Sequence, residues 1–422
     1  MMARRAVEVI SPPPTKLQIQ GSSSSSHSSA LFFFLGGIIF LIILLILIVA
    51  FWKFVKPSET MKFLLRRNKK QKASADFWSG NLRTISYFDF NTLKKATKNF
   101  HPSNLLGRGG FGPVYRGKLA DGRMVAVKKL SLEKSQQGES EFLSEVRMIT
   151  SIQHKNLVRL LGCCSDGPQR LLVYEYMKNR SLDLILYGKS DHFLDWKTRF
   201  QIILGIARGL QYLHEDSHLR IVHRDIKASN ILLDDKFQPR IGDFGLARFF
   251  PEDQAYLSTT FAGTLGYTAP EYAIRGELSE KADIYSFGVL VLEIISCRKN
   301  TDLTLPSDMQ YLPEYAWKLY ERSSVIDLVD PRMREHGFVE KDVLQAIDLA
   351  FLCLQPHANL RPPMSEIVAM LTCKVEMVGT PVKPSFLDRR SRKKDDFSWD
   401  TISEVFPSPL PSQSPSLTRQ KK

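Results

Sequence analysis

Cysteine is scarce in this sequence. Only five cysteines occur among 422 residues, namely Cys163, Cys164, Cys297, Cys353 and Cys373. Their number is odd and no Cys-x-x-Cys spacing occurs, so the sequence indicates neither a zinc site nor a disulfide framework. We expect small apolar thiols that are buried in a protein of a reducing compartment.

The long middle segment also lacks net charge, although the whole chain carries +14. Residues 53–72 contribute +7, residues 374–422 contribute +4 and residues 1–52 contribute +2, which leaves +1 for residues 73–373. A nucleic-acid-binding domain usually has a basic face of its own, so we expect no nucleic-acid partner. A basic flank is more typical of a segment at a membrane surface.

Residues 30–52 lack any charged side chain and read ALFFFLGGIIFLIILLILIVAFW. As a helix they would be about 34 Å long, enough to cross a hydrocarbon core of about 30 Å. A buried core helix is the alternative, but the stretch has no polar face. A cleaved signal peptide would be shorter and would begin earlier. We therefore predict one transmembrane helix.

The flanks of this helix indicate its orientation. Eight Lys or Arg side chains follow within residues 53–72, whereas a Ser-rich run at residues 22–29 precedes it. The positive-inside rule places the C-terminal side in the cytosol, which predicts a single-pass protein of the plasma membrane. The basic stretch would either bind anionic lipid or act only as a stop-transfer signal.

The chain divides into an extracellular Ser/Pro-rich segment 1–29, a transmembrane helix 30–52, a basic juxtamembrane linker 53–104, a folded domain 105–373 and a Ser/Pro-rich, basic tail 374–422. The first segment is too short and polar to fold as a ligand-binding domain, so sensing would need a co-receptor. The tail has the composition of a disordered segment. Its Ser408 and Ser414 each precede proline and are candidates for phosphorylation.

A glycine-rich stretch, LGRGGFGPV, occupies residues 106–114. The residues that follow have a strand–turn–strand pattern, whereas the glycine motif of dinucleotide-binding folds opens a helix. Without side chains at Gly107, Gly109 and Gly112, the backbone can close over phosphate groups. The sequence thus predicts a phosphate-binding loop within a β-hairpin.

A lysine and a glutamate are expected to meet behind this loop. Lys128 ends the run VAVK and shares a strand face with Ala126. A helix is predicted over about residues 137–152, and Glu145 lies on its apolar stripe. Because a carboxylate on an apolar face needs a partner, we expect Lys128 to pair with Glu145 and to hold phosphate oxygens. The alternative is an exposed Glu145 at a frayed edge of the stripe.

The densest polar motif is IVHRDIKASNILL at residues 221–233, followed by IGDFG at residues 241–245. Phosphoryl transfer needs Mg²⁺ held by oxygen ligands and a group aimed at the attacking hydroxyl. Asn230 and Asp243 are the candidate metal ligands, and Asp225 is the candidate hydroxyl acceptor. Lys227 can steady the transferring phosphate.

Together with Ala269-Pro270-Glu271, these motifs stand in the order of the protein kinase set. The sequence resembles protein kinases over roughly residues 100–373, with Val127 and Ile226 as conservative departures. The resemblance implies an α+β, two-lobed protein kinase fold, with a small β-rich N-lobe that has one helix and a larger helical C-lobe. It also implies ATP and Mg²⁺, or Mn²⁺ in its place, as cofactors.

The resemblance assigns further residues to the site. The ATP-binding residues that it implies are Leu106, Gly107, Gly109, Gly110, Gly112, Val114, Ala126, Lys128, Glu145, Tyr176, Met177 and Leu232. It places Tyr174 at the gate of the adenine pocket. It further implies that Asp283 braces the catalytic loop and that Arg361 pairs with Glu271.

Four phrases are similar to plant receptor-like kinases, the branch that contains the animal Pelle and IRAK kinases: FNTLKKATKNF at 90–100, HKNLVRLLG at 154–162, LVYEYM at 172–177 and GTLGY at 263–267. This implies protein Ser/Thr substrates, signal transduction and autophosphorylation. Lys227 and Thr264 favour Ser/Thr, with Tyr open as a second acceptor. Thr264 is expected to seat the substrate near Asp225, and His154 to have a structural role in a turn.

Regulation is the least constrained part of the prediction. Arg224 precedes the catalytic aspartate, where an arginine can pair with a phosphate on the activation segment. Thr259 and Thr260 lie in that segment and are candidate regulatory autophosphorylation sites. The alternative is that both are flexible surface hydroxyls.

Two other functions are less compatible with the sequence. A pseudokinase scaffold would lack at least one of Lys128, Asp225, Asn230 and Asp243, and all four are present. A receptor that senses a ligand by itself conflicts with the short segment 1–29. The sequence therefore predicts a membrane-anchored Ser/Thr protein kinase.

Overall fold

The computed structural model describes residues 85–109, 112–130, 136–188, 192–251, 253–373 and 381–383. The predicted transmembrane helix 30–52, the basic stretch 53–72 and the two Ser-Pro sites of the tail lie outside these ranges. No helix within them is long and apolar enough to cross a membrane.

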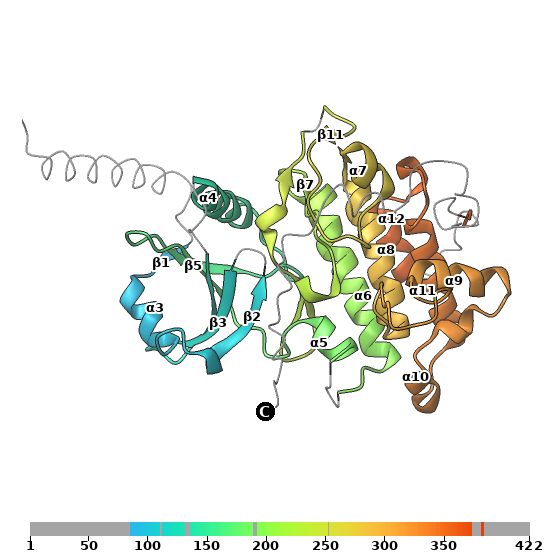
Figure 1. Ribbon diagram of the computed structural model, residues 1–422, viewed down its shortest axis with the longest axis horizontal. Coiled ribbons are helices and arrows are strands. Elements are labelled where there is room, and N and C mark those ends of the chain that lie inside the picture. The colour runs from blue at the N-terminus through green and yellow to red at the C-terminus, as the bar shows by residue number, and fades with distance from the viewer. Residues whose placement is uncertain are drawn as a thin grey trace, which may run out of the picture. The chain divides into compact units, whose positions relative to one another are not determined.

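The N-lobe is built on a six-stranded sheet with the order β1-β5-β6-β4-β3-β2 (Figure 1). Its strands are β1 (Ser86–Tyr87), β2 (Leu105–Gly109), β3 (Gly112–Lys118), β4 (Met124–Lys129), β5 (Leu160–Cys164) and β6 (Leu171–Glu175). β1 pairs with β5 in parallel, and the other neighbours are antiparallel. The predicted glycine-rich hairpin is therefore present as β2–β3.

Alternation of side chains positions the core of this lobe. Val125 and Val127 of β4 are fully buried and belong to one apolar cluster with Val173 of β6. The intervening residues, Ala126 and Lys128, point to the opposite face of the strand. One face of the sheet thus builds the core, and the other presents side chains to the candidate site.

Residues upstream of Leu105 belong to the folded lobe rather than to the linker to which the sequence analysis assigned them. Helix α3 (Phe90–Ala96) is capped by Asp89, which accepts a hydrogen bond from the Thr92 amide. Leu93 of α3 is fully buried in the apolar cluster. A single apolar side chain on a short element produces no periodic hydrophobic pattern. For this reason the start of the folded domain was predicted at residue 105, later in the chain than the structure places it.

Helix α4 (Gln136–Thr150) follows β4, close to the predicted helix 137–152. Phe142, Val146 and Ile149 are buried on one stripe, as a helical period of 3.6 requires. Glu145 lies on the same stripe and is 2% exposed. The helix therefore carries a carboxylate into the interior of the lobe.

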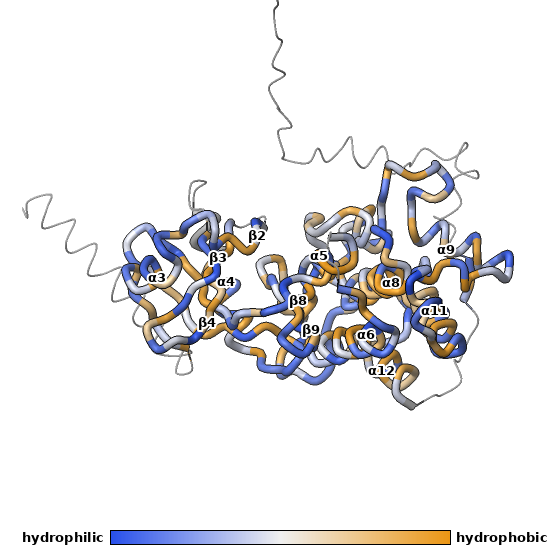
Figure 2. Tube along the Cα trace, turned by 90° about the horizontal axis from the view of Figure 1, so that it is seen from below, coloured by the Kyte–Doolittle hydropathy of each residue, from blue (hydrophilic) through white to orange (hydrophobic). Residues whose placement is uncertain are grey.

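The C-lobe is largely helical (Figure 1). Its helices are α5 (Leu182–Leu186), α6 (Trp196–Gln211), α7 (Pro270–Arg275), α8 (Glu280–Ser296), α9 (Leu312–Glu321), α10 (Pro331–His336), α11 (Glu340–Cys353) and α12 (Met364–Cys373). Helix α8 is buried from Ala282 to Ser296, and most of it is hydrophobic (Figure 2). It is the central helix on which the lobe is assembled.

Short pairs of strands complete the described part of the C-lobe. They are β7 (Ile221–Val222) with β10 (Arg248–Phe249), β8 (Ile231–Leu233) with β9 (Pro239–Ile241) and β11 (Leu257–Ser258) with β12 (Glu277–Leu278). Each pair is antiparallel. The described chain thus has a β-rich lobe and a helical lobe, which confirms the two-lobed α+β architecture. The N-lobe has two helices, α3 and α4, where one was expected, because α3 is too short to show a clear helical period.

Two buried carboxylates, Asp283 and Glu271, hold loops on this scaffold. Asp283 of α8 accepts hydrogen bonds from the amides of His223 (2.7 Å) and Arg224 (2.8 Å). Arg361 forms a bidentate pair with Glu271, at 2.6 and 2.8 Å. Both contacts agree with the sequence analysis, and the first of them anchors the loop that carries Asp225.

The thiols that the structure describes are unbridged. Cys163, Cys164 and Cys353 are buried, and Cys297 is half-buried. Burial raises the pKa of the Cys163 thiol to about 12, so this thiol stays protonated at neutral pH.

Candidate active site

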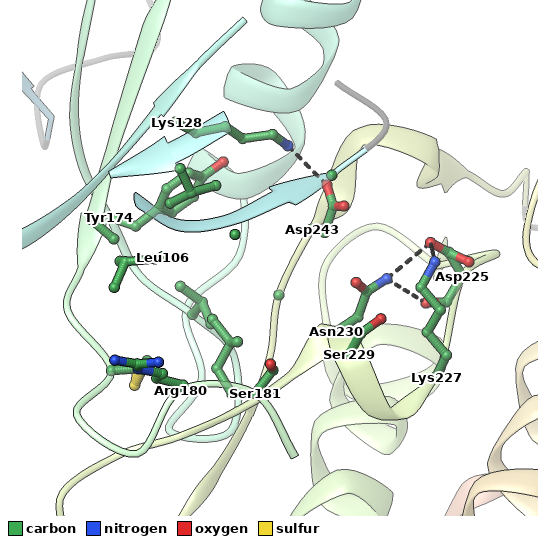
Figure 3. A pocket seen from close by; sticks show the side chains of 18 of the residues that line it. Leu106, Lys128, Tyr174, Arg180, Ser181, Asp225, Lys227, Ser229, Asn230 and Asp243 are labelled. Atoms are coloured by element: carbon green, nitrogen blue, oxygen red, sulfur yellow. Dashed lines mark hydrogen bonds and ion pairs between the residues drawn. The ribbon is translucent and has the colours of Figure 1, made fainter. Parts of the chain in front are cut away.

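A cavity of about 610 Å³ lies between the sheet of the N-lobe and the loops of the C-lobe. It is lined by residues of β2–β4, of the segment that joins the lobes (residues 175–177, called the lobe connection below), and of the loops around β8 and β9. Figure 3 shows the side chains that converge on it. Its volume is in the range of small-molecule and cofactor sites.

The glycine-rich hairpin forms one wall of the cavity. Gly112 has φ +137°, and a Cβ atom there would lie 2.0 Å from the carbonyl oxygen of Lys129, so only glycine fits. A Cβ atom on Gly109 would lie 3.7 Å from Oδ2 of Asp243. The hairpin backbone therefore passes close to the candidate metal ligand.

Lys128 and Glu145 form the predicted pair. Nζ of Lys128 donates to Oε1 (3.0 Å) and Oε2 (3.1 Å) of Glu145, and to Oδ1 of Asp243 at 2.8 Å. Burial opposes the charged ammonium, but the carboxylates of Glu145 and Asp243 outweigh it and raise the pKa of Lys128. Lys128 is therefore a fixed cation in the cavity, suited to hold phosphate oxygens.

Asp243 is held by its backbone and by its neighbours. Its φ of 62° lies in the left-handed region, which is rare for a residue with a side chain. The following ring, Phe244, is buried against His223 at a centroid distance of 5.0 Å. Burial alone would raise the pKa of Asp243, but Lys128 lowers it, so the carboxylate is ionised and able to bind a cation.

The loop between β7 and β8 brings the candidate catalytic groups together. Oδ1 of Asp225 accepts a hydrogen bond from the hydroxyl of Thr264 at 2.6 Å. Nζ of Lys227 lies 2.8 Å from Oδ2 of Asp225 and donates to the Thr264 hydroxyl at 2.8 Å. The carboxylate and the ammonium thus bind an aliphatic hydroxyl jointly, and the expected role of Thr264 in seating a substrate stays a prediction.

Asn230 and Asp243 fit the requirements of a magnesium site. Nδ2 of Asn230 donates to the carbonyl oxygen (2.8 Å) and to Oδ2 (2.9 Å) of Asp225, which orients the amide (Figure 3). This contact leaves the amide oxygen as the group that can bind a metal. Within the described residues, no group of three or more His, Cys, Asp or Glu side chains could hold a metal ion. Two oxygen ligands completed by nucleotide phosphates are typical of Mg²⁺.

Most of the residues implied for ATP binding line this cavity. They are Leu106, Gly107, Gly109, Gly112, Val114, Ala126, Lys128, Glu145, Met177 and Leu232. Tyr176 is half-buried but is not part of the lining, and Gly110 lies outside the described residues. Asp225, Lys227, Asn230 and Asp243 line the same cavity.

Several lining residues were missed by sequence reasoning. Arg180, Ser181 and Asp183 follow the segment that joins the lobes and face the cavity. Arg180 has φ +57°, which turns the chain at the entrance of the cavity. Nothing in the local sequence marks a left-handed arginine, so no signal was available for this turn.

Arg224 contacts the activation segment, which lies between Gly245 and Ala269, through backbone carbonyl oxygens. The guanidinium donates to the carbonyl oxygens of Thr260 (3.1 Å) and Leu246 (3.2 Å) and to the hydroxyl of Tyr272 at 3.0 Å. The Thr260 residue is exposed and Thr259 is half-buried. Both threonines are outside the cavity lining.

His154 lies in a turn, away from the candidate site. Its Nδ1 accepts a hydrogen bond from the Asn156 amide at 3.3 Å. The imidazole ring stacks on Tyr212 with a centroid distance of 5.0 Å. These contacts are those expected of a structural histidine.

Residues 100–371 match the family described as protein tyrosine and serine/threonine kinase. A probable LRR receptor-like serine/threonine-protein kinase of Arabidopsis thaliana is 48% identical over 342 residues, which cover 81% of this chain and 32% of that protein. Cold-responsive protein kinase 1 of the same plant is 46% identical over 309 residues, or 72% of this chain and 79% of that protein. The chain thus spans about a third of the length of the first relative.

Proposed function

We propose, from the premise that this chain belongs to the family of protein tyrosine and serine/threonine kinases, that it transfers the γ-phosphate of ATP to serine and threonine hydroxyls of protein substrates. The observation that carries the proposal is the contact of the Thr264 hydroxyl with Asp225 and Lys227, at 2.6 and 2.8 Å. This contact supports binding of an aliphatic hydroxyl by the candidate catalytic pair. A scaffold that only binds partners would not need a carboxylate and an ammonium, those of Asp225 and Lys227, that together contact a hydroxyl.

In this proposal, each side chain of the cavity has a separate role in phosphoryl transfer. Lys128, fixed by Glu145, holds phosphate oxygens, and the glycine-rich hairpin closes over them. Asn230 and Asp243 would hold Mg²⁺, or Mn²⁺, which when bound neutralises phosphate charge. Asp225 orients the attacking hydroxyl and accepts its proton.

Lys227 completes the catalytic pair. Its ammonium reaches both the Asp225 carboxylate and the position of a bound hydroxyl. A cation at this position can stabilise the charge that develops on the transferring phosphoryl group. Catalysis then depends on positioning and charge, as is general for phosphoryl transfer.

Membrane attachment belongs to the same proposal. The charge-free stretch 30–52 and the basic stretch 53–72 support a single-pass protein of the plasma membrane with the kinase domain in the cytosol. Receptor-like kinases among the relatives agree with this placement. A co-receptor would supply the sensing of a signal, and anionic lipid would contact the basic stretch.

A phosphotransfer assay tests the chemistry. The full chain, purified in detergent, is incubated with labelled ATP, Mg²⁺ and a generic protein substrate, beside Asp225→Asn and the control Asp235→Asn. Asp235 is exposed in a turn, so its variant should keep full activity, whereas Asp225→Asn should lose at least about a hundredfold. Equal activity of wild type and Asp225→Asn, or a product that is only phosphotyrosine, would contradict the proposal.

Topology is tested separately. Protease treatment of sealed membrane vesicles should leave the kinase domain accessible only from the cytosolic side. Recovery of the full chain in the soluble fraction would reject the membrane part and leave the enzymatic part intact.

A further inference from the structure

The two candidate metal ligands are at the ends of one β-hairpin. Asn230 directly precedes β8, and Asp243 follows β9 after a single glycine. The register pairs Ile231 with Ile241, so both ligands leave the hairpin at its open end. The position of this hairpin therefore fixes the metal site relative to the rest of the cavity.

Backbone hydrogen bonds hold the hairpin on both edges. The amide of Ile241 donates to the carbonyl oxygen of Asn156 at 2.8 Å, and that of Leu233 donates to Arg180 at 2.8 Å. Asn156 precedes β5, and Arg180 follows the segment that joins the lobes. The hairpin thus lies between two segments that also determine how the lobes are connected.

A contact between two charged side chains crosses from the hairpin to the lobe connection, beside the bond from Nδ2 of Asn179, just after that segment, to the carbonyl oxygen of Asp234 at 2.6 Å. Nη1 of Arg240, on β9, donates to Oε1 of Glu175 at 3.1 Å. Its Nη2 lies 3.7 Å from Oδ2 of Asp234, within the same hairpin, so only the Glu175 contact links the guanidinium to the lobe connection. Glu175 is the last residue of β6 and lines the cavity, and the same Oε1 accepts from the Arg159 amide at 2.8 Å. The Arg240 and Glu175 side chains are 25% and 17% exposed, so solvent screens this pair less than a surface pair.

We infer that Arg240 is a positioning residue: through Glu175 it sets the hairpin that carries Asn230 and Asp243 against the nucleotide end of the cavity. Neither side chain reaches the reacting atoms. In the same structure Lys128 is bonded to Glu145 and Asp243, so the Arg240–Glu175 pair is compatible with the arrangement that brings the phosphate-binding lysine and the metal ligand together. The inference rests on the proposed function.

Loss of the pair should weaken binding of the nucleotide with its metal more than it slows the chemical step. Arg240→Gln in the full chain should raise the KM for ATP about fivefold, the factor that corresponds to about 1 kcal/mol. The kcat should stay within about twofold, because the catalytic pair Asp225–Lys227 is not touched. Glu175→Gln, which keeps an acceptor for the Arg159 amide but removes the negative charge that attracts Arg240, should change the KM in the same direction.

The signs of the KM changes in the two variants distinguish positioning by the Arg240–Glu175 contact from a long-range electrostatic effect of either charge on ATP. If charge alone acted on ATP, removal of the Arg240 cation would weaken binding and removal of the Glu175 anion would strengthen it. Positioning requires that both variants raise the KM. It also requires that the effects of the two substitutions are less than additive in the double variant, because both weaken the same contact.

Controls complete the experiment. Lys236→Gln removes an exposed cation from the same hairpin and should leave the KM unchanged, and Arg240→Lys should recover part of the loss. Calorimetric titration with ADP and Mg²⁺ reads binding without phosphotransfer, so it tests the inference even if the proposed function fails. Opposite shifts, additive effects, or an unchanged KM and ADP affinity in both single variants would overturn the inference.

Discussion

The hydroxyl of Tyr174 donates to Oε1 of Glu145 at 2.6 Å, the same oxygen that accepts from Nζ of Lys128 at 3.0 Å. A residue of β6 thereby orients a carboxylate of α4, which in turn orients a lysine of β4. The geometry of the phosphate-binding lysine thus depends on a phenol at the back of the cavity.

Tyr174→Phe should destabilise the protein by about 2 kcal/mol, the usual value of a buried hydrogen bond to a charged group. The aromatic ring is retained, so no cavity forms. The loss should appear in chemical denaturation and as a higher KM for ATP. Tyr256→Phe, at an exposed position, is the control and should change neither quantity. Equal behaviour of the two variants would contradict the role of the phenol.

Removal of one partner of the Arg361–Glu271 pair should be among the most damaging substitutions. Their side chains are 0% and 7% exposed, so Arg361→Met leaves a buried carboxylate without its cation, at a cost of about 3–5 kcal/mol. Lys318→Met breaks the more exposed pair with Glu314 and should cost less than about 1 kcal/mol. Guanidinium denaturation of both variants gives the comparison, and similar losses would refute it.

Glu293 should make stability depend on pH. Burial raises its pKa to about 7 from 4.5, although the Tyr267 hydroxyl (2.7 Å) and the Asn300 amide (2.7 Å) donate to it. Between these pH values the native state binds more protons than the unfolded state, so the contribution of Glu293 to stability falls as pH rises.

The variant Glu293→Gln cannot titrate and tests this directly. Its free energy of unfolding, minus that of the wild type, should increase from about pH 5 to about pH 7 and then stay constant. Denaturation at several pH values measures the difference. Glu366→Gln, at an exposed position of α12, should show no such trend. A difference for Glu293→Gln that does not vary with pH would rule out the raised pKa.

A left-handed turn after α3 offers a stabilising substitution. Lys98, Asn99 and Phe100 have φ values of 53°, 58° and 51°, a conformation that is unfavourable for residues with side chains. Lys98→Gly should therefore stabilise the protein by about 0.5 kcal/mol, whereas Lys94→Gly, within α3, should destabilise it by about 1 kcal/mol. Thermal unfolding decides the signs, and destabilisation by both variants would contradict the strain.

The sequence predicted a side-chain contact correctly where one residue of the pair breaks a local pattern and therefore needs a partner. A carboxylate on the apolar stripe of α4 needed a cation, so Lys128 and Glu145 could be paired before the structure was known. Arg240 and Glu175 could not be paired, because 65 positions separate them and neither breaks a local pattern. The packing of residues 85–104 was missed for a related reason: contacts of short elements are set by tertiary structure.

Phosphorylation of the activation segment should raise the activity of the chain. Arg224 contacts the backbone of Thr260, whose residue is exposed, so a phosphate on this threonine would bring two negative charges close to the guanidinium. If Thr259 or Thr260 is the regulatory site, the unmodified chain should gain activity during preincubation with ATP. The Thr259→Ala/Thr260→Ala variant should keep its basal activity without this gain, and Ser258→Ala is the matched control. Time courses with and without preincubation measure the gain, and an equal gain in the double variant and the wild type would refute the switch.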